Sequence, residues 1–192
     1  MTMTKRNWIR LSIAALCVLL VHCKVEPTSS FSDQIEPFYG TYTGTSEPTV
    51  SDGEVSERDL TVTIAPWDKK GFTVTWTTVI YKADGETKKS APTINFYPSS
   101  RPGIFASAMK TDVFGHTVPY DPIAQDANPY VWAGLENNTL TVSALYIIDG
   151  GGYEMQVYKR SLKNSGLTLD FERIKDGESV TQLSALLEPV PD

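Results

Sequence analysis

Residues 139–149 read TLTVSALYIID, and this stretch decides the fold class. Apolar side chains recur at every second position, so that Leu140, Val142, Ala144, Tyr146 and Ile148 fall on one side. A period of two is that of a β-strand, whose successive side chains point to opposite faces of a sheet. The stretch therefore predicts a strand with one buried face.

The same alternation continues to the end of the chain. Residues 153–162 (YEMQVYKRSL), 167–174 (LTLDFERI) and 178–187 (ESVTQLSALL) each read as a strand, and short turns separate them. Asp176-Gly177 is a strong hairpin signal, because both residues tolerate positive φ. Four strands joined by such short turns predict an antiparallel meander.

The alternation also predicts which side chains of these strands face the core. Residues 167–174 place Leu167, Leu169 and Phe171 together, which favours them as the inward face. Residues 153–162 place Tyr153, Met155 and Val157 together, opposite a polar set that contains Glu154. On this pattern the carboxylates Glu154, Asp170 and Glu172 are outward, solvated charges. The polar set of residues 153–162 is Glu154, Gln156, Tyr158 and Arg160.

Two earlier segments, RDLTVTIA (58–65) and GFTVTWTTVIYK (71–82), alternate apolar residues with threonine. Threonine is β-branched and polar, which suits the wet face of a strand. No segment with a helical period rivals these strands, so the fold class is all-β. An antiparallel meander that closes into a barrel has no exposed edge. We therefore expect a barrel of about eight to ten strands, with a β-sandwich as the alternative.

The motif FYGTYTG (38–44) lies near the start of this meander, and Arg173 lies on a late strand. The pattern resembles the lipocalins and related calycins, in which a Gly-x-Trp on the first strand packs beneath a basic side chain from the last. Gly40 matches the glycine, and Tyr42 stands where that family has Trp. The resemblance implies a lipocalin-like barrel that binds a small ligand.

Residues 1–22 have the pattern of an export signal. A basic segment without acids, MTMTKRNWIR, precedes an apolar run of 11 residues, LSIAALCVLLV. A transmembrane helix needs about 20 apolar residues, so this run suits a signal peptide better than a membrane span. An uncleaved N-terminal anchor helix is the alternative.

Cys23 directly follows this apolar run. The sequence Leu20-Val21-His22-Cys23 resembles the box of bacterial lipoprotein signals, in which the cysteine receives the lipid. His22 departs from that pattern, because the family has a small residue there. We expect lipidation at Cys23 and attachment to the outer membrane, with ordinary signal cleavage as the alternative. The other cysteine, Cys17, lies in the leader, so the exported part contains no disulfide pair.

The predicted organisation is a signal peptide (1–22), a flexible tether (23–37) and one β-barrel domain (38–192). The segment from Pro98 to Pro129 interrupts the strand pattern with five prolines and several aromatic residues. A connection of this length inside a compact domain usually serves a function. We expect it to form a flap over one end of the barrel.

Composition excludes several classes of function. The formal net charge of −6 argues against nucleic acid as a partner and against electrostatic docking on anionic lipid. After the leader the chain has one histidine, His116, and no cysteine beyond Cys23, so no metal site or cofactor is expected. Ser-His-Asp catalysis lacks a Gly-x-Ser-x-Gly motif. We therefore expect a protein that is not an enzyme.

Aromatic residues provide the remaining lead, because such side chains line ligand cavities as well as ordinary cores. The leading hypothesis is a periplasmic, lipid-anchored barrel that binds a small apolar or amphipathic ligand and contacts the membrane only through its N-terminal anchor. The alternative is an inhibitor or an accessory of an envelope complex, with a filled core that binds a protein. An interior void of roughly 300 Å³ or more would favour the ligand. The candidate ligand-binding residues are Trp76, Phe105, His116, Tyr120, Trp132 and Tyr146.

Overall fold

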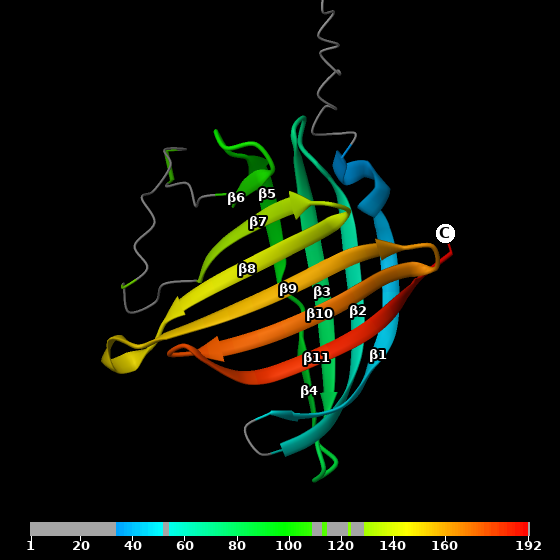
Figure 1. Ribbon diagram of the computed structural model, residues 1–192, viewed down its shortest axis with the longest axis vertical. Helices are drawn as coiled ribbons and strands as arrows, with labels where there is room; N and C mark the ends of the chain where they lie inside the picture. The colour runs from blue at the N-terminus through cyan, green and yellow to red at the C-terminus, as the bar shows by residue number, and fades with distance from the viewer. Residues whose placement is uncertain (1–33, 52–53, 109–112, 115–122, 124–128, 192) are drawn as a thin grey trace, which may run out of the picture.

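The computed structural model describes residues 34–51, 54–108, 113–114, 123 and 129–191. Two short 3-10 helices and eleven strands make up this part of the chain (Figure 1). None of its helices is long and apolar enough to cross a lipid bilayer. The elements are η1 (Glu36–Phe38), β1 (Gly40–Ser51), β2 (Glu54–Trp67), β3 (Gly71–Tyr81), β4 (Thr87–Ser90), β5 (Thr93–Pro98), β6 (Ile104–Ser107), β7 (Tyr130–Glu136), β8 (Thr139–Ile147), η2 (Asp149–Gly151), β9 (Tyr153–Lys163), β10 (Gly166–Lys175) and β11 (Glu178–Pro189).

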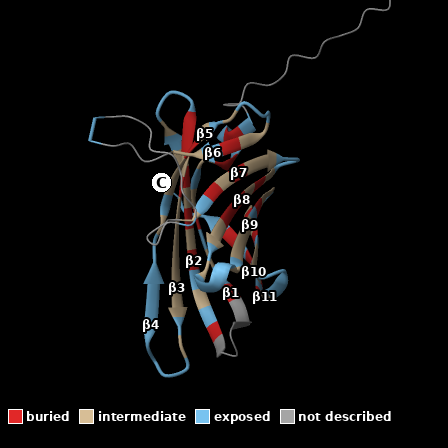
Figure 2. Cartoon of the chain, turned by 90° about the vertical axis from the view of Figure 1, so that its left-hand side faces the viewer, coloured by how far each residue is buried: buried red, intermediate tan, exposed pale blue. Residues whose placement is uncertain are grey.

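The strands form a closed antiparallel barrel, as the alternation predicts. Each strand of the ring pairs with the next one along the chain, except that β3 pairs with β5, and β1 closes the ring by pairing with both β2 and β11. Strand β4 pairs only with β3, at the opposite end of β3 from the residues that pair with β5. The other ten of the eleven strands in the described part therefore form the ring. The all-β meander and its closure are confirmed, and the fold is consistent with a lipocalin-like barrel. Figure 2 shows β4 exposed along its length, outside the ring.

The turn predicted at Asp176-Gly177 is present, and a turn of the same kind joins β7 to β8. Asn137 and Asn138 join β7 to β8 with φ of 47° and 60°, and Asp176 and Gly177 join β10 to β11 with φ of 49° and 90°. Two successive residues with positive φ give the turn whose twist matches that of the two strands. The glycine-rich residues 150–152 lie at η2, between β8 and β9.

Alternate threonines of the early strands lie on the outer, wet face and bond across the ladders. Thr41 and Thr63 hydroxyls are 3.0 Å apart, and those of Thr75 and Thr93 are 2.8 Å apart. Such cross-strand pairs each contribute a few tenths of a kcal/mol up to about 1 kcal/mol. They hold the register of β1, β2, β3 and β5.

The barrel end that carries η1 is filled with apolar side chains, and we call it the plugged end. Phe72 stacks on Phe96 at 5.1 Å between ring centroids and meets Phe105 edge-on at 5.3 Å. Phe38 at the end of η1 is 1% exposed, and Ile35 just before η1 is 0% exposed. The packed part of the chain therefore includes residues that precede β1.

The seam between β1 and β11 closes the ring and depends on a glycine. A Cβ atom at Gly44 would lie 2.3 Å from the backbone oxygen of Leu186. Only a residue without a side chain allows β11 to approach β1 this closely. The pairing at this seam is short, joining Tyr42 to Pro189 and Thr43 to Glu188.

Candidate functional site

Strand β9 turns its polar face into the barrel, and the expectation that Glu154 is an outward charge is wrong. Arg160 is only 1% exposed. Tyr158 pairs with Val142 of β8 and Phe171 of β10, both of which face inward. Register therefore places the whole alternate set of β9, from Glu154 to Arg160, inside. The outward prediction for Asp170 and Glu172 agrees with their bonds to Ser184 and Gln182 on the outer face of β11.

A chain of hydrogen bonds runs along this inner face of β9. The Tyr158 hydroxyl donates to Gln156 Oε1 at 2.8 Å, and Gln156 Nε2 donates to Glu154 Oε1 at 2.8 Å. The other carboxylate oxygen of Glu154 lies 3.9 Å from Nη1 of Arg173 on β10. Glu154, the one carboxylate in this hydrogen-bond chain, is thus engaged by both Gln156 and Arg173. Solvent reaches the Glu154 end of this hydrogen-bond chain, because the side chains of Glu154 and Arg173 are 19% and 22% exposed.

Arg160 is a buried cation held by aromatic rings. Its guanidinium carbon lies 5.6 Å from the ring centroid of Trp76 and 5.3 Å from that of Tyr158. Its Nε and Nη1 atoms have no hydrogen-bond partner among the described residues. Burial lowers the pKa of Arg160 to about 10, and the nearby Tyr158 partly opposes that shift. Arg160 therefore remains protonated at neutral pH, with N–H groups still able to donate.

A second guanidinium approaches from the other side of the barrel. Arg58 lies on β2, and β1, β11 and β10 separate β2 from β9 around the ring. Burial lowers the pKa of Arg58, and the positive charge of Arg173 lowers it further. The buried Nε of Arg58 also lacks a hydrogen-bond partner within the described residues. The interior thus gathers like charges, which repel one another in a medium less polar than water.

Arg58 and Arg160 line one interior cavity of about 60 Å³, which we call the arginine chamber. This volume is far below the roughly 300 Å³ that would favour a ligand held wholly inside the barrel, so the described interior does not meet that criterion. It has room for a few waters, each of which needs about 10–15 Å³, or for a small polar group of similar total size. Its walls are otherwise largely apolar. The lining residues are Arg58, Leu60, Thr61, Val62, Trp76, Thr77, Thr78, Tyr158, Arg160, Leu169, Phe171, Leu183 and Leu187.

The tyrosines beside the chamber stay neutral. Burial raises the pKa of Tyr158 to about 12, and the nearby Tyr146 raises it too, while Arg160 opposes the shift. Burial likewise raises the pKa of Tyr146, with a smaller contribution from Glu154. Both therefore serve as hydrogen-bonding hydroxyls at physiological pH. Within the described residues, no three His, Cys, Asp or Glu side chains gather as a metal site would need.

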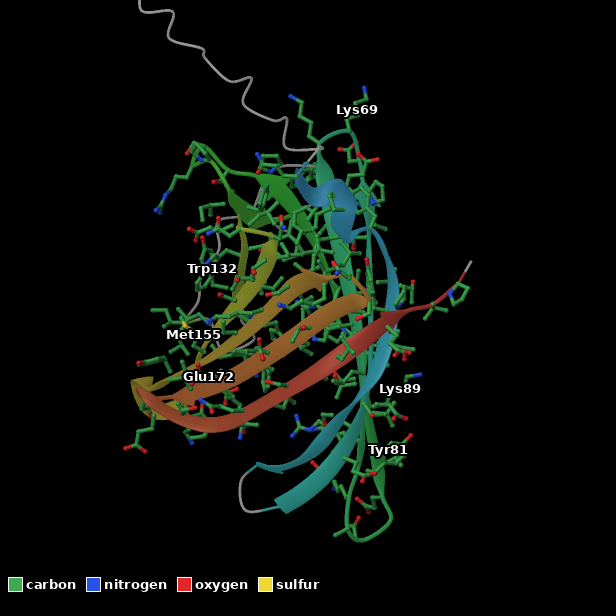
Figure 3. All side chains as sticks on the ribbon, turned by 45° about the vertical axis from the view of Figure 1, so that its right-hand side comes forward. Lys69, Tyr81, Lys89, Trp132, Met155 and Glu172 are labelled. Atoms are coloured by element: carbon green, nitrogen blue, oxygen red, sulfur yellow. The ribbon has the colours of Figure 1, made fainter. Side chains whose placement is uncertain are left out.

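The predicted ligand-binding residues fall in different parts of the molecule. Trp76 lines the arginine chamber, and Tyr146 lies on the inner face of β8, opposite Glu154 of β9. Phe105 belongs to the plugged end. Trp132 lies on the outer side of the wall, as Figure 3 shows, because its neighbours Val131 and Ala133 face inward. His116, Tyr120, Cys23 and most of the predicted flap lie outside the described residues.

The sequence reasoning missed the charged residues of the chamber, above all Arg58 and Arg160. It assigned the apolar side of residues 153–162 to the core, as amphipathic alternation suggests. Arg173, which the lipocalin resemblance singles out, lies near Glu154, whereas Arg160 lies over the aromatic rings of Trp76 and Tyr158. The register between β9 and its neighbours carries the missing signal. Val142 and Phe171 flank Tyr158, so Tyr158 must share their inward side.

A second hollow, of about 620 Å³, lies at the turn between β5 and β6 and at the β7–β8 hairpin. Its lining includes Gly103, Gly134, Asn137 and the outward Lys159. These are turn and outer-face residues, so the hollow is a depression of the surface. It lacks the converging buried charges of the arginine chamber.

No protein-family model matches the sequence, and no curated protein matches it significantly. Among solved structures, the chain is similar to EF1p2_mFAP2b bound to DFHBI, with 14% identity over 84% of this chain and 100% of that one, and a TM-score of 0.41. It is also similar to a Bacteroides fragilis protein with a YmcC-like fold, with 11% identity over 80% and 96% of the two chains and a TM-score of 0.26. Likenesses this distant carry no argument about function.

Proposed function

We propose that this protein is a non-catalytic binding protein of the cell envelope, and that its barrel takes the polar end of a small amphipathic ligand. The arginine chamber carries the proposal. Its walls combine the guanidinium groups of Arg58 and Arg160 with apolar side chains such as Val62 and Leu183. A site that pairs a few placed polar groups with apolar walls is typical of small-molecule recognition.

The size of the chamber defines the mode of binding. About 60 Å³ accommodates a head group and not a complete ligand. The remainder of the ligand would extend toward the end of the barrel that Glu154 and Arg173 occupy, where solvent reaches their side chains. The opposite direction is closed by the phenylalanines of the plugged end.

The chemistry of the groups that line the chamber supports the non-catalytic role. Guanidinium groups bind and orient a ligand but do not give up a proton near neutral pH. Tyr158, with its pKa raised to about 12, is also a poor proton donor or acceptor for catalysis at that pH.

The envelope location is supported by the leader alone. The basic segment, the apolar run and Cys23 at its end together favour export and a lipid anchor. Mass analysis of the mature protein tests this part directly. An acyl mass on Cys23 is expected, and an unmodified Cys23 in the mature protein contradicts the anchor.

Native mass spectrometry of the protein purified from its own envelope tests the binding function. We expect a small molecule that stays bound in the folded protein and is released on unfolding. Trp76→Ala should lose this molecule, because Trp76 lines the chamber. Trp132→Ala is the matched control and should keep it, since Trp132 lies on the outer wall. Protein that carries no small molecule in either form contradicts the proposal.

A second candidate function, binding of a partner protein, is favoured by the outer wall of β7–β9. Tyr130, Ile147 and Tyr153 are 44%, 38% and 39% exposed there, and Trp132 and Met155 lie on the same side (Figure 3). Clustered exposed aromatic and apolar residues are enriched in protein interfaces. Loss of a co-purifying protein on Tyr153→Ser, with the small molecule absent, would favour this candidate.

A further inference from the structure

We propose that the arginine chamber is a receptor for an oxyanion, a carboxylate or phosphate group bound jointly by Arg160 and Arg58. This inference rests on the proposed binding function and names the chemical class of the group that enters the chamber. An amphiphile with an acidic head and a free inorganic oxyanion share this chemistry. The experiment below separates the two sources.

Arg160 is held in place as a donor. Trp76 and Tyr158 contact the guanidinium at 5.6 and 5.3 Å from their ring centroids, which restricts its orientation. A guanidinium has five N–H donors in one plane and can stack on aromatic rings without using these donors. Nε and Nη1 have no partner among the described residues, although the side chain is almost fully buried. A buried charged donor of this kind requires an acceptor.

Arg58 supplies a second donor from the opposite wall. It lines the same cavity, and its buried Nε lacks a partner in the described part of the chain. Ser46 pairs with Arg58 across the β1–β2 ladder, and its buried hydroxyl also has no hydrogen-bond partner among the described residues. Two guanidinium groups that converge from strands on different sides of a barrel favour an anion between them.

The nearby carboxylate does not neutralise these cations. Glu154 receives a hydrogen bond from Gln156 and pairs with Arg173 at 3.9 Å. The inner face of the described barrel thus brings three arginines, Arg58, Arg160 and Arg173, near one carboxylate. An oxyanion in the chamber would supply the missing negative charge. This positive interior contrasts with the formal net charge of −6 for the whole chain.

Calorimetric titration of the purified full chain with three probes tests the inference. Octanoate carries a carboxylate and an apolar tail, 1-octanol has the same tail without the charge, and inorganic phosphate is an oxyanion without a tail. We expect octanoate to bind about tenfold more tightly than octanol, or better, because hydrogen bonds to charged groups are the stronger ones.

Two variants and one matched control locate the binding group. Arg160→Met and Arg58→Met should each weaken octanoate binding about tenfold or more. Lys159→Met removes the same charge from the adjacent, exposed position of β9 and should change the affinity less than about twofold. Arg160→Lys should recover part of the loss. Circular dichroism and thermal unfolding confirm that each variant is folded, and Arg58→Met remains informative if Arg160→Met fails to fold.

The outcomes separate this inference from the proposed function. If octanoate and octanol bind equally well and Arg160→Met changes neither, the oxyanion inference is wrong and the amphiphile function stands. If phosphate alone binds, and binds through Arg160, the oxyanion inference stands and the amphiphile function is wrong. If none of the three probes binds, both are overturned. Phosphate and octanoate that compete for one Arg160-dependent site support both.

Discussion

The plugged end and the arginine chamber belong to one barrel and follow opposite rules. At the plugged end the inward side chains are phenylalanine and aliphatic residues, nearly all of them fully buried. In the chamber the same strand periodicity presents guanidinium groups to the interior. The first region uses the interior for packing, while the second places charges where they are costly. The difference indicates that one region provides stability and the other provides recognition.

The plugged end and the arginine chamber contribute to the free energy of folding with opposite signs. Burial of apolar surface stabilises the fold by roughly 25 cal/mol per Å². A guanidinium loses hydration when it is buried, and aromatic contacts return only part of that free energy. Arg160, with no ion-pair partner among the described residues, is therefore expected to oppose folding, whereas Phe72 supports it. Substitutions at the two regions should shift stability in opposite directions.

The largest effect is expected at the plugged end. Phe72→Ala removes a fully buried ring that contacts Phe96 and Phe105, and should destabilise the protein by about 3–5 kcal/mol. Unfolding in denaturant measures the change. A loss below about 1 kcal/mol would mean that this end is not the stabilising region.

The chamber should respond with the opposite sign. Arg160→Met replaces a buried cation with an apolar side chain of similar length and should stabilise the protein by about 1–4 kcal/mol. Lys159→Met, on the exposed side of the same strand, should stay within about 0.5 kcal/mol of the parent. Destabilisation by Arg160→Met in denaturant unfolding would show that Arg160 serves the fold, and the contrast between the two regions would fail.

The seam that holds the two regions in one ring gives a smaller effect. Gly44→Ala forces a Cβ atom against the backbone oxygen of Leu186 and should cost about 1–3 kcal/mol. Gly134→Ala is the control, because its nearest contact would be Ile104 at 3.8 Å. We expect the melting temperature to fall in Gly44→Ala and to stay unchanged in Gly134→Ala. Equal behaviour of the two variants would place the critical closure elsewhere.

The smallest effect concerns the hydrogen-bond chain of β9. Tyr158→Phe should cost about 1 kcal/mol at neutral pH, because one buried hydrogen bond is lost. In the parent protein, the pKa of Tyr158 rises from 10.0 to about 12 on folding. As pH rises, Tyr158 therefore loses its proton in the unfolded chain before it does so in the folded one. The stability that this pKa difference represents is lost as pH rises from 10 to about 12. Alkaline unfolding of Tyr158→Phe should show a shallower fall. An unchanged slope would mean that Tyr158 is not shielded from water.

Much of the fold could be predicted from local pattern. The alternation in residues 139–149 and 167–174 identifies β8 and β10 and their inward faces, and Asp176-Gly177 identifies the turn that follows. Of the candidate site, the prediction included Trp76, which lines the chamber, and Tyr146, which lies beside Glu154. Trp132 was also a candidate, and it lies on the outer wall.

The sequence by itself determines most of the strands and turns, because a period of two and a turn signal are properties of neighbouring residues. It does not determine which face of β9 is inside, since that face is set by register against β8 and β10. Nor does it bring Arg58 and Arg160 to one cavity, because they lie on strands far apart in the chain and line the same chamber only after the barrel closes. Tertiary structure decides these points because Trp76, whose ring lies beside the buried Arg160, comes from a strand distant in the chain.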